Sequence, residues 1–167
     1  KQLGHIFVTG DPNAVPESTG GIKTLPFSSF DKYSSENPGL DVKVSDVERC
    51  MFTSGTTGMP KGVSRNHGGV VLTVRGYIQQ HGVRSEDVLM SVLTLGHANA
   101  QVMCLFTAIG SGATAVFYPR FSASSFWKWA AECGATCVNM LGAVSEYLWA
   151  TEPGEWDKKH NVRTVLS

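Results

Sequence analysis

The chain has 167 residues, of which 42% are hydrophobic and 17% charged, and its 14 Lys and Arg are matched by 14 Asp and Glu. This length favours a single domain that buries roughly 70% of the surface of its unfolded chain. The zero net charge gives no electrostatic reason to expect nucleic acid or an anionic membrane as a partner.

The first 46 residues predict an irregular lead-in. The segment His5–Gly10 (HIFVTG) has the pattern of a short strand, and Asp11–Asp46 is rich in Pro, Gly, Ser, Thr and Asn without apolar periodicity. We expect one short helix near Ser28–Tyr33 and otherwise a long surface connection.

The pattern sharpens after residue 46. Val47–Thr53 (VERCMFT) predicts a strand that leads into the glycine-rich segment 53–62 (TSGTTGMPKG). Pro60 lacks an N–H group and stiffens this segment, so Lys61 should begin a strand or a turn and not a helix. Asn66 can then cap a helix over His67–His81, which Gly82 would end.

From Asp87 onward, strands and helices are expected to alternate over short loops. The expected strands cover 87–95, 113–118 and 135–141, with another beginning at 162, and the expected helices cover 98–110, 123–133 and 143–150. The nearly continuous apolar run of the first strand is typical of a strand that is covered on both faces. The pattern predicts an α/β fold with a largely parallel sheet, in which residues 47–167 form the core.

The sequence argues against a membrane span. Residues 88–119 contain no Asp, Glu, Lys or Arg, but glycines, His97 and polar amides divide them into pieces shorter than the ~20 apolar residues that a span needs. The four cysteines form no Cys-x-x-Cys pair, which favours reduced packing residues in a cytoplasmic protein over a metal or disulfide site.

The segment 53–62 has the composition of an anion-binding loop. Its glycines let successive N–H groups point inward, its hydroxyls add donors, and its lysine adds a cation. The candidate phosphate ligands are Thr53, Ser54, Gly55, Thr56, Thr57, Gly58 and Lys61. The pattern G-x-x-x-x-G-K-[ST] does not fit, because Pro60 precedes the lysine and Gly62 follows it, and the early G-x-G of a dinucleotide loop is missing. A plain glycine-rich hairpin turn is the alternative.

Four stretches of the chain resemble the adenylate-forming (AMP-binding) enzymes, a superfamily of acyl-CoA synthetases, luciferases and nonribosomal-peptide adenylation domains. Phe52–Val63 (FTSGTTGMPKGV) resembles their signature phosphate loop. Leu93–Gln101 (LTLGHANAQ) resembles a second motif, in which an aromatic residue and a histidine border the carboxylate pocket; His97 matches the histidine, and Gly96 replaces the aromatic residue. Residues 110–143 and the segment HIFVTGD near the start are similar to crotonobetaine/carnitine-CoA ligases, so the resemblance covers nearly the whole chain.

This resemblance implies part of the large N-terminal domain of such a ligase, with ATP, Mg²⁺ and coenzyme A as its cofactors. A small-molecule carboxylic acid would attack the α-phosphorus of ATP, and the acyl group of the resulting adenylate would pass to the coenzyme A thiol. The loop Thr53–Lys61 would hold the β- and γ-phosphates, His97 would lie at the carboxylate, and Asn99 would line the acid pocket. Without the resemblance, a histidine that begins a buried helix is more often a packing residue.

The sequence after the loop contains no counterpart of the family's glutamate for Mg²⁺, of its aspartate for the ATP ribose, or of its C-terminal domain. We therefore expect a fragment of a larger ligase that has no metal site of its own and is inactive alone. An exposed sheet edge would allow it to self-associate. The alternative, from a different class, is a stand-alone nucleotide- or anion-binding module without catalysis.

Overall fold

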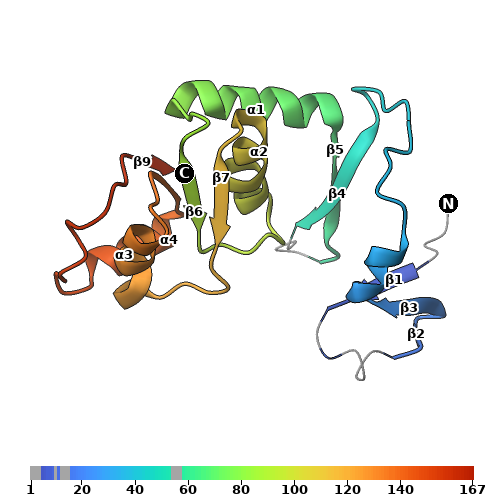
Figure 1. The fold of residues 1–167 in the computed structure, drawn as a ribbon, viewed down its shortest axis with the longest axis horizontal. Coiled ribbons are helices and arrows are strands. Elements are labelled where there is room, and N and C mark those ends of the chain that lie inside the picture. The colour runs from blue at the N-terminus through green and yellow to red at the C-terminus, as the bar shows by residue number, and fades with distance from the viewer. Residues whose placement is uncertain (1–4, 10, 12–15, 54–57) are drawn as a thin grey trace. The chain divides into compact units, whose positions relative to one another are not determined.

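The computed structural model describes residues 5–9, 11, 16–53 and 58–167. The chain divides into two compact units, Lys1–Asp41 and Val42–Ser167, whose helices and strands are labelled in Figure 1.

The first unit contains a small three-stranded sheet. Strand β1 (His5–Val8) pairs in parallel with β3 (Ile22–Pro26), and β2 (Ser18–Thr19) pairs with β3 in the antiparallel sense. A 3₁₀ helix, η2 (Phe27–Lys32), follows β3 directly. The predicted first strand and the predicted short helix are therefore confirmed.

The expectation of an irregular connection from Asp11 to Asp46 is wrong where β2 and β3 form. Gly20 and Gly21, with φ of +58° and +75°, make the two-residue turn between these strands, as the twist of a tight hairpin requires. The Gly-Gly pair was a signal for this hairpin. The pairing of β3 with β1 carries no local signal, because it joins segments far apart in the sequence.

The second unit is built on a four-stranded parallel sheet in the order β7-β6-β8-β9. Its strands are β6 (Val88–Ser91), β7 (Thr114–Phe117), β8 (Cys137–Asn139) and β9 (Thr164–Leu166). The predicted α/β fold with a parallel sheet is confirmed, and each strand is shorter than its apolar run because the last residues of the run continue into the loop.

Helices cover both faces of this sheet, as Figure 1 shows. They are the π-helix η3 (Ala100–Phe106) with its continuation α2 (Thr107–Ser111), α3 (Ala123–Glu132) and α4 (Gly142–Trp149), while α1 (His67–His81) packs on η3 and α2. Phe126 of α3 packs with Met90 and Val138 on one face, and Cys104 of η3 packs with Leu89 and Leu166 on the other. Burial of both faces explains why the strands and the buried helix within the uncharged run 88–119 are apolar.

Three helix ends test the predicted caps. Asn66 Oδ1 accepts a hydrogen bond of 2.7 Å from Gly69 N, and Gly82 ends α1 with a φ of +58°, so both predictions are confirmed. Ser122 stands at the start of α3 as predicted, but its hydroxyl bonds to the hydroxyls of Ser124 and Ser125 and not to the backbone.

The predicted helix 98–110 forms, but its first part is a π-helix. The hydroxyl of Thr107 donates a 2.7 Å hydrogen bond to the carbonyl of Val102, five residues earlier, where the turn is widened. Within the described part of the chain, no helix is long and apolar enough to cross a membrane. All four cysteines are free thiols, and Cys104 and Cys137 are buried.

An antiparallel hairpin precedes α1. Its strands are β4 (Val47–Thr53) and β5 (Lys61–Asn66), and its register places Met51 opposite Val63. The prediction that Lys61 begins a strand is confirmed. Among the described strands, the hairpin pairs only with itself, and β5 runs directly into α1.

Candidate functional site

The hairpin brings the two ends of the predicted phosphate loop together. Thr53 ends β4 opposite Lys61 at the start of β5, and the hydroxyl of Thr53 donates a 3.4 Å hydrogen bond to the carbonyl of Lys61. Both residues are exposed. Gly58 has a φ of +151°, a conformation that residues with side chains rarely adopt. The candidate ligands Ser54, Gly55, Thr56 and Thr57 lie outside the described residues.

His97 lies beside this hairpin. A cavity of about 380 Å³ is lined by Arg49, Met51, Phe52, Thr53, Val63, Arg65, His97 and Ala98. The predicted site residues Thr53 and His97, 44 positions apart, therefore share one cavity. The side chain of His97 is exposed, which does not match the alternative that it is a packing residue of a buried helix.

The position of His97 follows from the topology of the sheet. The chain leaves the carboxyl end of the central strand β6 at Ser91 and reaches His97 through Leu93–Leu95. In open α/β sheets, ligands bind outside the carboxyl ends of the strands. The backbone N–H of His97 donates to the carbonyl of Thr94 at 3.2 Å, which holds the turn that presents the imidazole.

The side chain of Asn99 contacts its own helix, and its predicted place in the acid pocket stays a prediction. Asn99 is half-buried at the start of the helix, and its amide nitrogen donates to the sulfur of Met103 at 3.2 Å. It is not among the residues that line the cavity beside His97. Its Oδ1 atom is buried without a hydrogen-bond partner among the described residues.

Sequence reasoning missed two cationic residues of this cavity, Arg49 and Arg65. They are direct partners in the hairpin ladder and therefore project from the same face. The alternation of side chains along the two predicted strands was the signal that could have found them. The side chain of Arg49 is only 12% exposed, whereas Arg65 is exposed.

At the carboxyl edge of the sheet, buried polar groups are satisfied by one another. The hydroxyl of Ser91 donates to Asn139 Oδ1 at 3.0 Å, and the Asn139 amide nitrogen donates to the carbonyl of Leu166 at 3.1 Å. The backbone N–H of Leu93 in turn donates to the Ser91 hydroxyl at 3.1 Å. This chain of bonds fixes the strand end from which the His97 segment departs.

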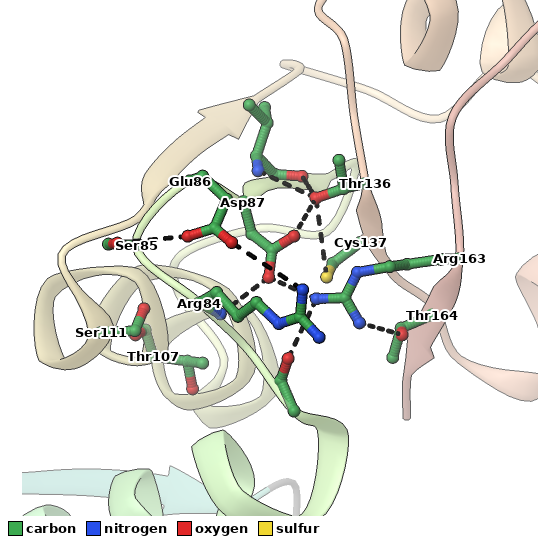
Figure 2. A network of polar contacts seen from close by, with 12 residues as sticks. Arg84, Ser85, Glu86, Asp87, Thr107, Ser111, Thr136, Cys137, Arg163 and Thr164 are labelled. Atoms are coloured by element: carbon green, nitrogen blue, oxygen red, sulfur yellow. Dashed lines mark hydrogen bonds and ion pairs between the residues drawn. The ribbon is translucent and has the colours of Figure 1, made fainter.

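The opposite, amino edge carries a second polar cluster, formed by Arg84, Asp87, Thr136 and Arg163 and called here the Asp87 network. Figure 2 shows Thr136 and Arg163 converging on the buried carboxylate of Asp87. Asp87, Thr136 and Arg163 each stand directly before a strand, β6, β8 and β9 respectively. The cluster therefore joins the starts of three adjacent strands, which is a structural role.

The carboxylate of Asp87 is held by three donors. They are the hydroxyl of Thr136 at 2.7 Å, the backbone N–H of Arg84 at 2.7 Å and the guanidinium of Arg163. Burial by itself raises the pKa of Asp87, but the hydrogen bonds from Thr136, Arg84 and Arg163 outweigh it and leave the pKa below its ordinary value. Asp87 is therefore a carboxylate at neutral pH, paired and not available as an acid.

The described residues contain no group of three or more His, Cys, Asp or Glu placed to hold a metal ion.

Comparison with known proteins agrees with this geometry. The AMP-binding enzyme family matches residues 11–167. The chain is 33% identical over 165 residues to the long-chain fatty acid transport protein 3 of Mus musculus, covering 97% of this chain and 24% of that protein. It is 31% identical over 172 residues to a crotonobetaine/carnitine–CoA ligase of Shigella flexneri, covering 99% of this chain and 31% of that protein. It thus spans about a quarter to a third of these relatives.

Solved structures share the fold at lower identity. The anthranilate CoA ligase AuaEII in complex with anthranoyl-AMP superposes with a TM-score of 0.82 at 20% identity, over 98% of this chain and 31% of that one. The O-succinylbenzoate coenzyme A synthetase of Bacillus subtilis in complex with ATP and magnesium ion superposes with a TM-score of 0.70 at 21% identity, over 97% of this chain and 34% of that one. From the match over residues 11–167 and the shared fold, the chain belongs to the AMP-binding enzyme family, and its relatives include crotonobetaine/carnitine–CoA ligases.

Proposed function

We propose that this chain carries the phosphate loop and one wall of the acid pocket of an ATP-dependent acyl-CoA ligase. In this reaction a carboxylic acid is activated as an acyl-adenylate, with release of pyrophosphate, and the acyl group is then transferred to the thiol of coenzyme A. The observation that carries the proposal is the cavity shared by Thr53 at the end of the loop and His97 from the carboxyl edge of the sheet. The acid and ATP can react only if they are held close together, so the phosphate loop and the acid pocket must adjoin each other.

In this proposal the hairpin binds the leaving group. Thr53, Ser54, Gly55, Thr56, Thr57, Gly58 and Lys61 hold the β- and γ-phosphates through hydroxyl and backbone donors and one ammonium group. The Lys61 side chain is exposed at the start of β5, so its ammonium can follow the phosphates as charge moves to the departing pyrophosphate. The residues that contact the α-phosphorus and the thiol are not assigned within this chain.

His97 and the walls of the cavity receive the acid. The imidazole borders the carboxylate, while Met51, Val63 and Ala98 provide apolar contact for the carbon chain. Asn99 is also proposed as a pocket residue. Because its side chain turns toward Met103, we place it farther from the acid than His97. These residues alone do not assign the acyl group of the acid; carnitine-like, fatty and aryl acids are the classes that the family resemblance suggests.

ATP, Mg²⁺ and coenzyme A are proposed as the cofactors of the complete ligase, and one solved relative of the fold is described in complex with ATP and magnesium ion. The described residues offer no group of three or more His, Cys, Asp or Glu for a metal ion, so no ligand of Mg²⁺ is proposed among them. A cytoplasmic location and self-association through a sheet edge stay predictions. The alternative of a stand-alone anion-binding module does not explain why a partly apolar cavity with an exposed histidine adjoins the loop.

The test of the proposed function begins with nucleotide binding. We expect the 167-residue chain to bind ATP with a dissociation constant on the order of millimolar, and to catalyse no acid-dependent exchange of pyrophosphate into ATP. Lys61→Met should weaken ATP binding measured by calorimetry, whereas Lys128→Met, which removes an exposed lysine of α3, should not. Unchanged ATP binding in Lys61→Met would contradict the assignment of the loop.

In the complete ligase, Lys61→Ala should reduce pyrophosphate–ATP exchange at limiting ATP by about ten- to a hundredfold. The lost contact is a charge-assisted hydrogen bond worth ~1.5–3 kcal/mol. Exchange kinetics equal to those of the wild type would refute this role of Lys61.

A further inference from the structure

We propose that the cavity beside His97 binds a second negatively charged group of the acid between Arg49 and Arg65, so that the preferred substrates are acids with two anionic groups. This proposal rests on the proposed function, because it assigns a substrate class to the same cavity.

The first observation is the pairing of two like charges. Arg49 and Arg65 stand directly opposite each other in the antiparallel ladder, and both line the cavity of about 380 Å³. Like charges in this relation destabilise a hairpin, and a two-stranded hairpin has little stability to lose. An anion held between the two guanidinium groups turns this repulsion into two favourable contacts.

The second observation is the environment of Arg49. Its side chain is 12% exposed, its guanidinium carbon lies 5.3 Å from the centroid of the Phe106 ring, and its Nη1 atom lies 2.9 Å from Glu48 Oε2. The Glu48 contact is close enough for ionic attraction but lacks hydrogen-bond geometry. Arg49 Nε and Nη1 are therefore buried without a hydrogen-bond partner among the described residues. Both donors are enclosed by protein, so the contacts with Glu48 and Phe106 hold the Arg49 side chain in place at the wall of the cavity that it lines.

The charge balance of the cavity points the same way. Arg49, Arg65 and His97 line it, and no Asp or Glu does so among its described lining residues. Glu48 comes from the bulge between Val47 and Arg49 and offsets one of the two arginine charges. One guanidinium charge remains for a ligand, which matches a single carboxylate or a group of similar charge.

The walls of the cavity favour an organic acid over a nucleotide phosphate. Met51, Val63 and Ala98 lie between the polar ends of the cavity and suit a carbon chain. Arg49 stands four residues before Thr53 on the same strand, about 13 Å away at ~3.3 Å per residue. A group held by the arginines is therefore well separated from phosphates held at the loop.

The experiment is a titration of the ¹⁵N-labelled chain with adipate, hexanoate and ATP, followed by nuclear magnetic resonance of the arginine Nε–H and backbone N–H signals. Adipate and hexanoate have equal carbon numbers, but only adipate has a second carboxylate. Adipate should shift the Nε–H signals of Arg49 and Arg65 and bind about tenfold more tightly than hexanoate. ATP should instead shift the amide signals of Gly58 and Lys61.

Two variants and one control assign the effect. Arg49→Met and Arg65→Met should each reduce adipate affinity to that of hexanoate, whereas Arg75→Met, on the exposed side of α1, should leave the difference unchanged. If Arg49→Met does not fold, Arg65→Met decides, because Arg65 is exposed and its removal relieves a repulsion.

Equal affinity for adipate and hexanoate, or no adipate-dependent shift at all, would overturn the proposal. Displacement of adipate from the arginines by ATP would also overturn it, by assigning them to a phosphate of the nucleotide. If ATP does not shift the amide signals of Gly58 and Lys61, the proposed function is contradicted instead. The difference in affinity between adipate and hexanoate would still test the role of the two arginines.

Discussion

Replacing Arg163 by Met tests the Asp87 network. The guanidinium of Arg163 donates to Asp87 and, at 3.0 Å, to the carbonyl of Gly82. The substitution keeps much of the apolar stem but removes the cation from a buried carboxylate. Asp87 retains its bonds from Thr136 and from the backbone of Arg84, each of 2.7 Å. We therefore expect a folded but less stable chain.

The magnitude follows from the unequal burial of the pair. The Asp87 side chain is 4% exposed and that of Arg163 is 39% exposed. Breaking a fully buried pair costs about 3–5 kcal/mol, and an exposed pair contributes about 0–1 kcal/mol. Because water screens one partner, we expect Arg163→Met to lower the free energy of unfolding by about 1–2 kcal/mol. Asp87→Ala should cost about 3 kcal/mol, since it also leaves the Thr136 hydroxyl and the Arg84 N–H without their acceptor.

Urea unfolding followed by circular dichroism measures this change. Arg84→Met is the matched control, because the Arg84 side chain is 71% exposed and reaches Glu86 only at 3.9 Å. The control should stay within about 0.5 kcal/mol of the wild type. If Arg163→Met were as stable as the Arg84→Met control, the network would not hold the starts of the three strands together.

The same carboxylate sets a pH dependence. Burial raises the pKa of Asp87, but its hydrogen bonds lower it more, so the folded chain holds the ionised form more tightly than the unfolded chain does. The stabilisation is therefore fully present above the ordinary aspartate pKa of about 3.9 and is lost as the pH falls through the lower folded value. In the Asp87→Asn variant, this loss of stability below about pH 4 should be smaller than in the wild type.

Three further predictions concern the helices and the cysteines. Asn66→Ala should lower the free energy of unfolding by about 1 kcal/mol, while Ser122→Ala, at a helix start without a backbone cap bond, should cost less than about 0.5 kcal/mol in the same urea titration. Gly110→Ala should cost about 1 kcal/mol or more, because its new Cβ would lie 2.8 Å from a buried methyl group of α1; equal midpoints would disprove this close approach. Mass spectrometry after alkylation of the folded chain should find Cys50 labelled and Cys104 unlabelled, because Cys50 is exposed and burial raises the pKa of Cys104 to about 12; early labelling of Cys104 would show that η3 opens.

Local signals in the sequence predicted most of the second unit. The apolar runs located the parallel strands, and Asn66 and Gly82 fixed the bounds of α1 because capping chemistry depends on residues next to one another. The π-helical turn ending at Thr107 could not be predicted, since a helical apolar pattern does not distinguish a widened turn from an ordinary one. In the first unit, the pairing of β3 with β1 was missed because it depends on contacts between distant segments.

The candidate site was predicted by composition and resemblance, but its assembly was not. The loop residues and His97 were named from two separate motifs, and only the fold brings Thr53 and His97 to one cavity. Arg49 and Arg65 were missed because their importance comes from facing each other across the hairpin, a relation that depends on register. Asn99 was expected in the pocket from its place in the motif; its amide nitrogen donates to the sulfur of Met103, and its role in the pocket stays a prediction.

The strand order of the parallel sheet also has a consequence for how the chain folds. The hairpin joins residues eight positions apart, but Val88 meets Thr136 across 48 positions, and Asn139 meets Leu166 across 27. Loop closure therefore favours early formation of the hairpin and late pairing of β6 with β8. Arg163, the cation of Asp87, arrives with the last strand, so a chain that has not yet added β9 buries a carboxylate without its counter-charge. β9 therefore docks in the same step in which Arg163 pairs with the Asp87 carboxylate. We expect the amide hydrogens of β6, β8 and β9 to exchange with solvent as a single cooperative group.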